Sequence, residues 1–313
     1  RHVGVPFLAG DVLRIRIRLQ LAHFRMIRQA LQRVDLQLAE VLADPLQRRR
    51  IKALVTEENH LVIGDGLSTE AMTTLTTGAF LVAFALLVGA NNFQIGLLAS
   101  MPTFTNIFQL LSIWLVQKFN NRRAVVVICS VLARVPLIVI ASLPLLFETA
   151  SIDILIFFLF FLYFFGSIAG PAWNSWMKDL VPEASLGTYF ARRASYAQTL
   201  NAVLSLLMAL GVDFVKKRYP QYELFTYAFM FLAAGLFGIY GVFCLFRTPE
   251  PQSGLARENI FKLFKRALQN ANFRKLLAFN SAWIFAVNIA TPFFTVFLLK
   301  TMGLPLAYII ALT

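Results

Sequence analysis

The chain has 313 residues, of which 58% are hydrophobic and only 14% are charged, and its mean hydropathy is +0.67. Soluble domains carry about 25% charged residues, so this composition excludes an ordinary soluble enzyme or binding domain. The formal net charge of +13 would suggest a nucleic-acid partner in a soluble protein. In a protein with many membrane spans, basic residues instead mark the loops that stay in the cytoplasm, so we expect a lipid bilayer and no nucleic acid.

The first 59 residues form a polar N-terminal segment ahead of the apolar ones, and we expect it to be a cytoplasmic extension. Apolar residues step by three and four through Phe24, Ile27, Leu31, Val34, Leu38 and Val41. This spacing predicts one amphipathic helix, which can lie on the anionic inner leaflet of a membrane. The alternatives are a variable extension or translated residues upstream of the true start.

Seven long apolar segments follow, each close to the roughly 20 residues that a helix needs to cross a hydrocarbon core about 30 Å thick. They cover residues 63–88, 93–116, 124–147, 152–177, 194–215, 222–246 and 276–299. An eighth begins at Leu304, for which only residues 304–312 remain. We therefore expect an all-α membrane protein, a helical bundle truncated after its seventh span.

The connectors after the second, fourth and sixth predicted spans are basic. They carry Lys118, Arg122 and Arg123, then Lys178, Arg192 and Arg193, then a series from Arg247 to Lys275. The positive-inside rule places the N-terminus and these connectors in the cytoplasm, in a plasma or inner membrane. Lys216, Lys217 and Arg218 fall on the opposite side, an exception that we attribute to side chains snorkelling at a helix end.

The long connector divides the apolar segments into two groups. We expect a six-helix bundle at residues 60–246, a cytoplasmic linker at 247–275 with a short surface helix near 260–268, and the start of a second bundle at 276–313. Six spans, a basic linker and then new spans is the layout of a two-bundle transporter.

Three stretches resemble the major facilitator superfamily. Residues 92–98, Asn-Phe-Gln-Ile-Gly-Leu-Leu, are similar to the start of the family's second helix, where Gly96 would let helices approach closely. Residues 173–193 resemble the loop after its fourth helix, whose acidic-Pro turn and Gly-Arg cluster correspond to Asp179, Pro182, Gly187, Arg192 and Arg193. Phe273-Arg274 and Pro292-Phe293-Phe294 resemble the start of the second bundle.

The loop after the second span departs from the family's pattern. Its basic end is kept at Lys118, Arg122 and Arg123, but the family's acid and both glycines are replaced. The resemblance therefore does not imply the charge latch that would depend on that acid.

What the resemblance implies is a bundle of two inverted three-helix repeats and secondary transport of a small solute by alternating access. A proton or a sodium ion would be the coupling ion, no cofactor is expected, and we expect a monomer. A membrane-embedded enzyme acting on a lipid-linked substrate and a non-transporting sensor are the alternatives.

An enzyme of that kind would need a cluster of Asp, Glu, His or Cys at a membrane face. His2, His23 and His60 all precede the first span, whereas Cys129 and Cys244 lie singly inside spans. We therefore expect no metal site, no disulfide and no enzymatic activity.

Polar side chains inside the spans are the candidate solute site, because an ionised group at mid-helix costs roughly 2.5–3.5 kcal/mol on insertion scales. Glu70, Thr73, Thr74 and Thr77 share one face of the first span, which we expect to border the cavity. Hydrogen bonding between helices is the alternative. Both roles stay open for Thr103, Asn106, Gln109, Gln198, Asn201, Ser205, Asn288, Thr291 and Thr295.

Arg134, in the third span, is the most deeply placed charge. We expect a structural ion pair, with Glu70 as the leading partner on grounds of depth, ahead of substrate binding. We place the ion pair first because the third helix of the major facilitator superfamily, which this chain resembles, usually packs away from the cavity. Asp65 and Asp213 are expected to be hydrated caps near span ends, and Trp173 and Trp176 to belong to an interfacial aromatic belt.

Overall fold

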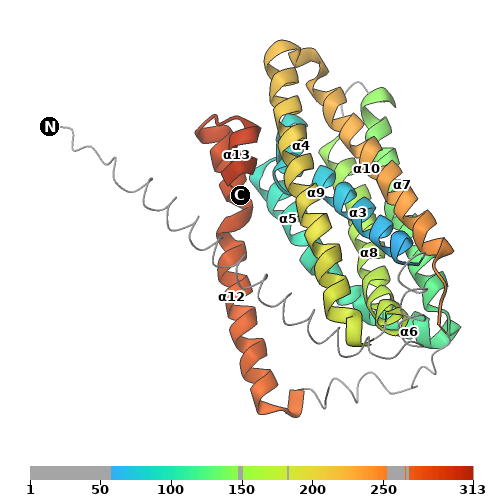
Figure 1. The fold of residues 1–313 in the computed structure, drawn as a ribbon. Helices are drawn as coiled ribbons and strands as arrows, with labels where there is room; N and C mark the ends of the chain where they lie inside the picture. Colours follow the sequence, from blue (N-terminus) through green and yellow to red (C-terminus); the bar gives the residue numbers. More distant parts are fainter. Residues whose placement is uncertain (1–57, 147–150, 182, 252–264, 266–267, 313) are drawn as a thin grey trace.

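The computed structural model describes residues 58–146, 151–181, 183–251, 265 and 268–312. Within these residues the regular structure is helical, with no strand, which confirms the all-α class (Figure 1). The predicted amphipathic helix at residues 24–41 lies outside the described residues, as does most of the predicted surface helix near 260–268.

The first predicted span forms two helices, α3 (Glu58–Thr76) and α4 (Gly78–Leu87), which meet at Thr77. Gly78 has a φ of +59°, a left-handed conformation that glycine adopts without steric cost. The Thr77 hydroxyl donates a hydrogen bond to the Thr73 carbonyl at 2.8 Å, which satisfies its donor at the break. The segment thus changes direction part-way through the bundle.

The second predicted span is broken in a similar way into α5 (Asn92–Thr105), a 3₁₀ turn η1 (Asn106–Phe108) and α6 (Gln109–Phe119). A capping box between Asn91 and Gln94 fixes its start. It is not one of the six helical stretches that are long and apolar enough to cross a membrane. The reason is its polar content, including Asn106 and Gln109, both of which line the pocket described below.

The remaining helices of the first group are α7 (Arg122–Leu146), α8 (Ile152–Leu180), α9 (Glu183–Arg218), η2 (Pro220–Tyr222) and α10 (Glu223–Arg247). Helices α7, α8, α9 and α10 each contain a stretch that can cross a membrane, as predicted. However, α9 begins at Glu183, so Gly187, Arg192 and Arg193 lie within a helix rather than in the predicted loop. Pro182 falls outside the described residues.

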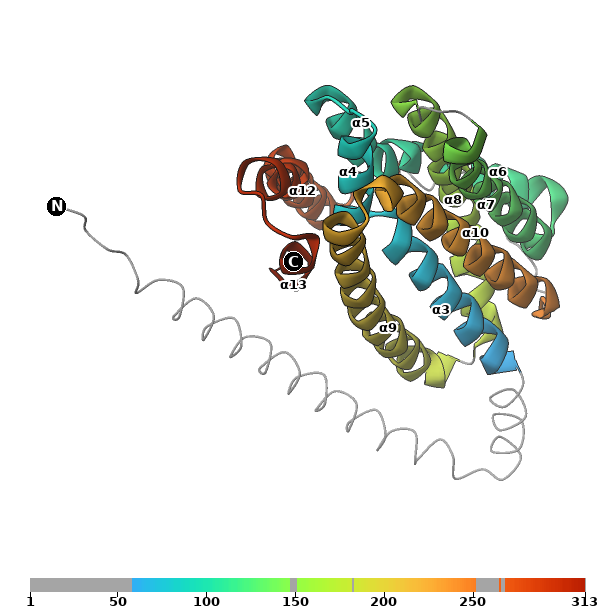
Figure 2. The same cartoon turned by 90° about the horizontal axis from the view of Figure 1, so that it is seen from above.

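The end of the chain forms α12 (Ala271–Val296), the π-helical η3 (Phe297–Thr301) and α13 (Leu306–Leu312). Seen from above, α3 lies between α9 and α10, whereas α12 stands at one edge beside α4 and α5 (Figure 2). Asp213 of α9 accepts hydrogen bonds from the backbone N–H groups of Leu306 and Ala307 at 2.9 and 2.8 Å. Asp213 is therefore a helix cap, and the helix that it caps is α13.

Two apolar clusters hold the bundle together, one towards each end. Along α7, Val125, Val126 and Cys129 belong to the first cluster, and Leu137 and Ile140 belong to the second. Ser130, which lies between the two groups in the sequence, and Arg134, which follows Ala133 of the second cluster, line the pocket. Residues of both clusters also line the pocket, which therefore lies where the two clusters meet.

Arg122 joins three segments at one end of the bundle. Its guanidinium pairs with Asp179 at the end of α8, with Nη1 2.6 Å from Oδ2, and with Glu250 after α10, with Nε 3.5 Å from Oε1. The same Nη1 donates to the Ser175 carbonyl at 3.0 Å, and the Arg122 backbone N–H donates to Glu250 at 2.9 Å. Although the loop after the second span lacks the family's acid, acids from two other segments hold this arginine.

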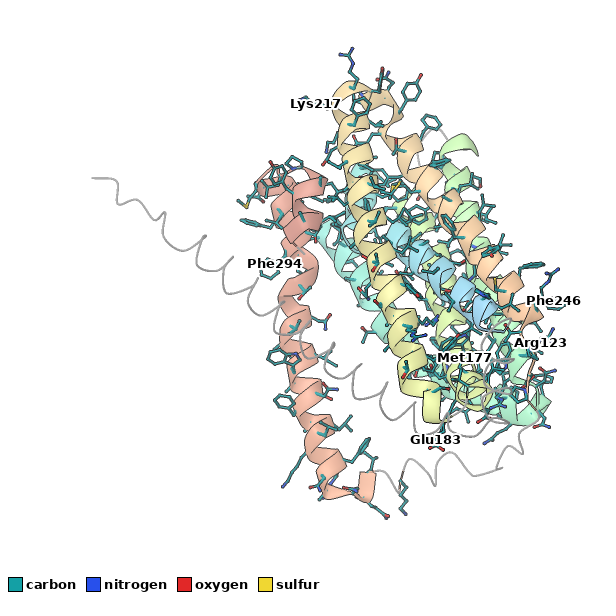
Figure 3. The ribbon with its side chains drawn as sticks, viewed as in Figure 1. Arg123, Met177, Glu183, Lys217, Phe246 and Phe294 are labelled. Atoms are coloured by element: carbon teal, nitrogen blue, oxygen red, sulfur yellow. The ribbon has the colours of Figure 1, made fainter. Side chains whose placement is uncertain are left out.

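Trp176 adds a second link between α8 and the chain that follows α10. Its side chain is fully buried, and its indole N–H donates to the Pro249 carbonyl at 3.0 Å. The prediction that Trp176 lies in an interfacial belt was wrong, because the residue packs under the chain that leaves α10. Arg123 and Glu183 mark this end of the molecule, and Lys217 marks the opposite end (Figure 3).

Replacing Arg122 by Gln should lower the thermal unfolding temperature of the purified protein in detergent. The change removes a buried donor set from two carboxylates, which should cost on the order of 2 kcal/mol, or roughly 4–8 °C. The matched control is Arg192→Gln, which removes the same charge from an exposed position. Equal unfolding temperatures for the two variants would contradict the role given to Arg122.

Candidate functional site

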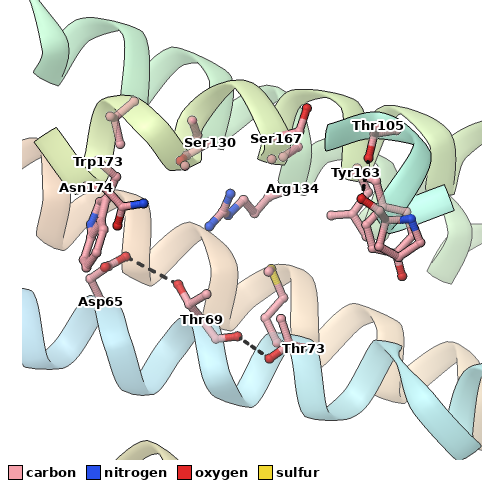
Figure 4. A pocket seen from close by; sticks show the side chains of 18 of the residues that line it. Asp65, Thr69, Thr73, Thr105, Ser130, Arg134, Tyr163, Ser167, Trp173 and Asn174 are labelled. Atoms are coloured by element: carbon pink, nitrogen blue, oxygen red, sulfur yellow. Dashed lines mark hydrogen bonds between the residues drawn. The ribbon is translucent and has the colours of Figure 1, made fainter. Parts of the chain in front are cut away.

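A pocket of about 440 Å³ lies inside the bundle, between α3, α7 and α8, with further walls from the α5–α6 segment and α9 (Figure 4). A cavity of this size suits a small molecule. Its polar lining is Asp65, Thr69, Thr73, Thr76, Thr77, Thr105, Asn106, Gln109, Ser130, Arg134, Tyr163, Ser167, Trp173, Asn174 and Arg193. Among the residues that line it, only Asp65, Arg134 and Arg193 carry a charge.

One wall is a row of side chains spaced by four residues: Asp65, Thr69 and Thr73 of α3, and Thr77 at the break that follows it. Helical geometry places residues four apart on one face, so this row points into the pocket together. The Thr73 and Thr77 hydroxyls donate to backbone carbonyls one turn earlier, at 3.0 and 2.8 Å. Their oxygen lone pairs stay free to accept a hydrogen bond from a bound molecule.

Glu70 is not part of this row. Its carboxylate accepts a hydrogen bond from the Asn201 amide of α9, with Nδ2 2.8 Å from Oε1, and it does not line the pocket. No ion pair joins Glu70 to Arg134 in the described part of the chain. The predicted partnership between these two residues was therefore wrong, since equal depth along two helices does not place side chains on facing sides.

Asp65 pairs with Arg193 across the pocket floor, with Oδ2 3.6 Å from Nη2. The Thr69 hydroxyl donates to the same carboxylate at 3.4 Å, and the Arg193 guanidinium lies 4.7 Å from the Trp173 ring centroid. Asp65 is only 3% exposed, so the prediction that it stays hydrated was wrong. Trp173 likewise lines the pocket instead of joining an interfacial belt.

Glycine at position 66 makes room for Arg193. A Cβ atom at Gly66 would lie 2.4 Å from Arg193 Nε and 2.9 Å from Cζ, closer than van der Waals contact allows. Any side chain there would push the guanidinium away from Asp65. The ion pair thus depends on a glycine in α3 as well as on its two charged members.

Arg134 of α7 is 7% exposed and lines the pocket near its centre. Its side chain extends from α7 towards the side of the pocket that holds Asp65, Trp173 and Asn174 (Figure 4). It takes part in none of the ion pairs of the described residues, and its Nε has no hydrogen-bond partner there. The Asp65 carboxylate interacts favourably with the Arg134 charge, although Asp65 already forms its ion pair with Arg193.

The stem of Arg134 packs over Gly238 of α10, where a Cβ atom would lie 2.5 Å from Arg134 Cγ and 3.0 Å from Met72 Sδ. Two pocket arginines from different helices are therefore each accommodated by a glycine on a neighbouring helix. The third span also supplies Ser130 and Ala133 to the lining. The expectation that this helix packs away from the cavity was wrong.

The predicted polar residues divide between the pocket and other places. Thr73, Thr77, Asn106 and Gln109 line it, and the Gln109 amide donates to Asn106 at 2.9 Å. Thr74 is buried outside the lining, and Thr103 and Gln198 are exposed away from it. Asn288 and Thr291 are exposed on α12 and donate to carbonyls of their own helix.

Of the predicted loop residues, Arg122 and Asp179 pair with each other and Arg193 reaches the pocket. Lys118 lies 4.7 Å from the Trp114 ring centroid, and Arg123 donates to the Phe246 carbonyl and stacks on its ring. Gly187 and Arg192 are exposed on α9. Searched over its described residues, the chain shows no group of three or more His, Cys, Asp or Glu side chains that could hold a metal ion.

Comparison with known proteins gives one match. A family model described as Major Facilitator Superfamily matches residues 67–313, which is most of the chain. Neither a curated protein nor a solved structure matches. The match begins inside α3, so it covers the pocket apart from Asp65.

Replacing Gly238 by Ala should destabilise the protein, because the added methyl overlaps the Arg134 stem. Overpacking of this kind costs about 1–3 kcal/mol, whereas Gly→Ala in an open helical position gains up to about 1 kcal/mol. Gly211→Ala is the matched control, since no atom lies within 4 Å of a Cβ there. Thermal unfolding in detergent should therefore give a lower temperature for the first variant than for the second. The reverse order would show that Arg134 does not pack against Gly238.

Proposed function

Because the chain belongs to the major facilitator superfamily, we propose that it is a secondary active transporter that moves a small solute by alternating access. The observation that carries this proposal is a pocket inside a membrane-spanning bundle whose lining holds three charged side chains and a row of hydroxyl groups. Charged and hydroxyl side chains inside such a bundle are costly unless they serve a solute or a coupling ion. The protein would act as a monomer and without enzymatic turnover.

In this proposal residues 60–246 form one bundle, residues 247–275 link it to the next, and residues from 276 onward begin the second. Helix α12 supports this division, because its main contacts with the described part of the first bundle are with α4 and α5. Rocking of one bundle against the other would then expose the pocket to each side of the membrane in turn. Asn288 and Thr291 on α12 would face the solute only in the arrangement that brings the bundles together.

Glu70 is the proposed site of coupling if the driving ion is a proton or sodium. Its carboxylate lies beside the pocket row on α3 and is held by Asn201 of α9. A change in the α3–α9 contact during transport would alter the surroundings of this carboxylate. Gln198, one turn from Asn201 on the same helix, would enter the solute path only if α9 rotates.

A single cysteine at Ser167 tests alternating access without knowledge of the solute. Ser167 lines the pocket from α8, and Cys129 and Cys244 are buried and can be replaced by Ala. In vesicles that hold the full-length protein, an impermeant maleimide should modify Ser167→Cys when it is added on either side. Modification from one side only would favour a non-transporting sensor and would contradict the transport proposal.

The proposed orientation places the Arg122 end of the bundle in the cytoplasm. Asn120, between α6 and α7, lies at that end, and Gln221 in η2 lies at the other. With intact cells, an external impermeant maleimide should label Gln221→Cys and should label Asn120→Cys only after the cells are permeabilised. The opposite pattern would invert the topology.

A further inference from the structure

We propose that the pocket binds a small organic oxyanion of one negative charge, and that Arg134 is the residue that holds the anionic group. This inference rests on the proposed transport function, and it names the class of solute. It follows from the charges of the lining, from the geometry of Arg134 and from the walls around it.

The charged side chains that line the pocket have a net charge of +1, from two arginines and one aspartate. Asp65 and Arg193 form an ion pair at 3.6 Å, and Thr69 adds a hydrogen bond to the carboxylate. Arg134 is the third charged group of the lining and belongs to none of the ion pairs in the described residues. A solute with a single negative charge would bring the charge of the lining to zero.

The geometry of Arg134 points to an oxyanion. The residue is more than nine-tenths buried, its guanidinium is directed into the pocket, and its Nε has no hydrogen-bond partner among the described residues (Figure 4). A guanidinium presents parallel N–H donors that match two oxygens of one carboxylate, sulfonate or phosphate group. Packing of its stem against Gly238 fixes where those donors lie before a solute arrives.

The other walls suit an organic body rather than a fully hydrated ion. Met72, Ala133 and Leu162 contribute apolar surface, and Tyr163 and Trp173 contribute aromatic surface. The threonine row on α3 can accept a hydrogen bond from a hydroxyl or amine elsewhere on the solute. Inorganic phosphate would leave these apolar walls without contact, so we favour an organic anion.

The test uses the charge of the labelling reagent and needs no knowledge of the natural solute. Ser167→Cys in the Cys129→Ala, Cys244→Ala background is treated with anionic sulfonatoethyl methanethiosulfonate and with its cationic trimethylammonioethyl counterpart. Arg134→Gln should lower the ratio of anionic to cationic labelling rates at least roughly tenfold, as expected for one charge within about 10 Å in a medium of intermediate dielectric. The ratio at Gly187→Cys, on the exposed face of α9, should stay unchanged. An unchanged ratio at Ser167→Cys would overturn the proposal.

Protection experiments identify the anion. Benzenesulfonate should slow labelling of Ser167→Cys, whereas neutral benzenesulfonamide and inorganic phosphate should not. Arg134→Lys keeps the charge but not the paired donors, so it should keep the labelling ratio and lose most of the protection. This variant decides the proposal if Arg134→Gln does not fold. Protection by phosphate alone, by the sulfonamide equally well, or by none of the three would overturn the assignment of an organic anion.

These outcomes are separate from those that test transport. If Ser167→Cys labels from one side only, the transport proposal fails, and the charge ratio measured from that side still decides whether the pocket prefers anions. If labelling occurs from both sides without anion preference, transport stands and the solute class is wrong.

Discussion

An apolar bundle offers no water to its charged side chains, so each must be neutralised within the protein or serve a ligand. This constraint explains most of the polar contacts. Arg122 is fully buried at one end and pairs with Asp179 and Glu250, which ties together α7, α8 and the chain after α10. Arg193, nearer the middle, pairs with Asp65 of α3. Arg134 is also buried but forms no ion pair among the described residues, and the proposed solute site rests on that difference.

Glycines determine where these arginines lie. Gly66 and Gly238 lack the Cβ atoms that would collide with Arg193 and Arg134, so the helices can approach while long side chains pass between them. Both guanidinium groups line the pocket, which lies where the two apolar clusters meet. In the proposed site, stability and solute binding would be coupled, because the contacts that hold α3, α7, α9 and α10 together also position the two arginines.

The sequence predicted the helices well, because a run of about 20 apolar residues leaves few alternatives. Six such stretches agree with the structure, and the second differs because pocket-lining polar residues lower its hydropathy. Contacts between helices were harder to predict. Glu70 was chosen for its depth, but the four-residue row Asp65, Thr69, Thr73 and Thr77 is the one that faces the pocket. That spacing was visible in the sequence. The pairing of Asp65 with Arg193 was not, because it depends on how α9 is rotated about its own axis and on its start at Glu183.

We propose that Arg134, buried and without an ion pair in the part of the chain that the structure describes, makes this pocket a carrier site for an organic anion. Exchange of labelled benzenesulfonate across proteoliposomes that contain the full-length protein tests it most directly, because the permanent charge prevents passive entry. We expect saturable uptake that is accelerated by unlabelled benzenesulfonate inside and is lost in Arg134→Gln but not in Arg192→Gln. Uptake no faster than in protein-free liposomes, or equal uptake with Arg134→Gln, would contradict it.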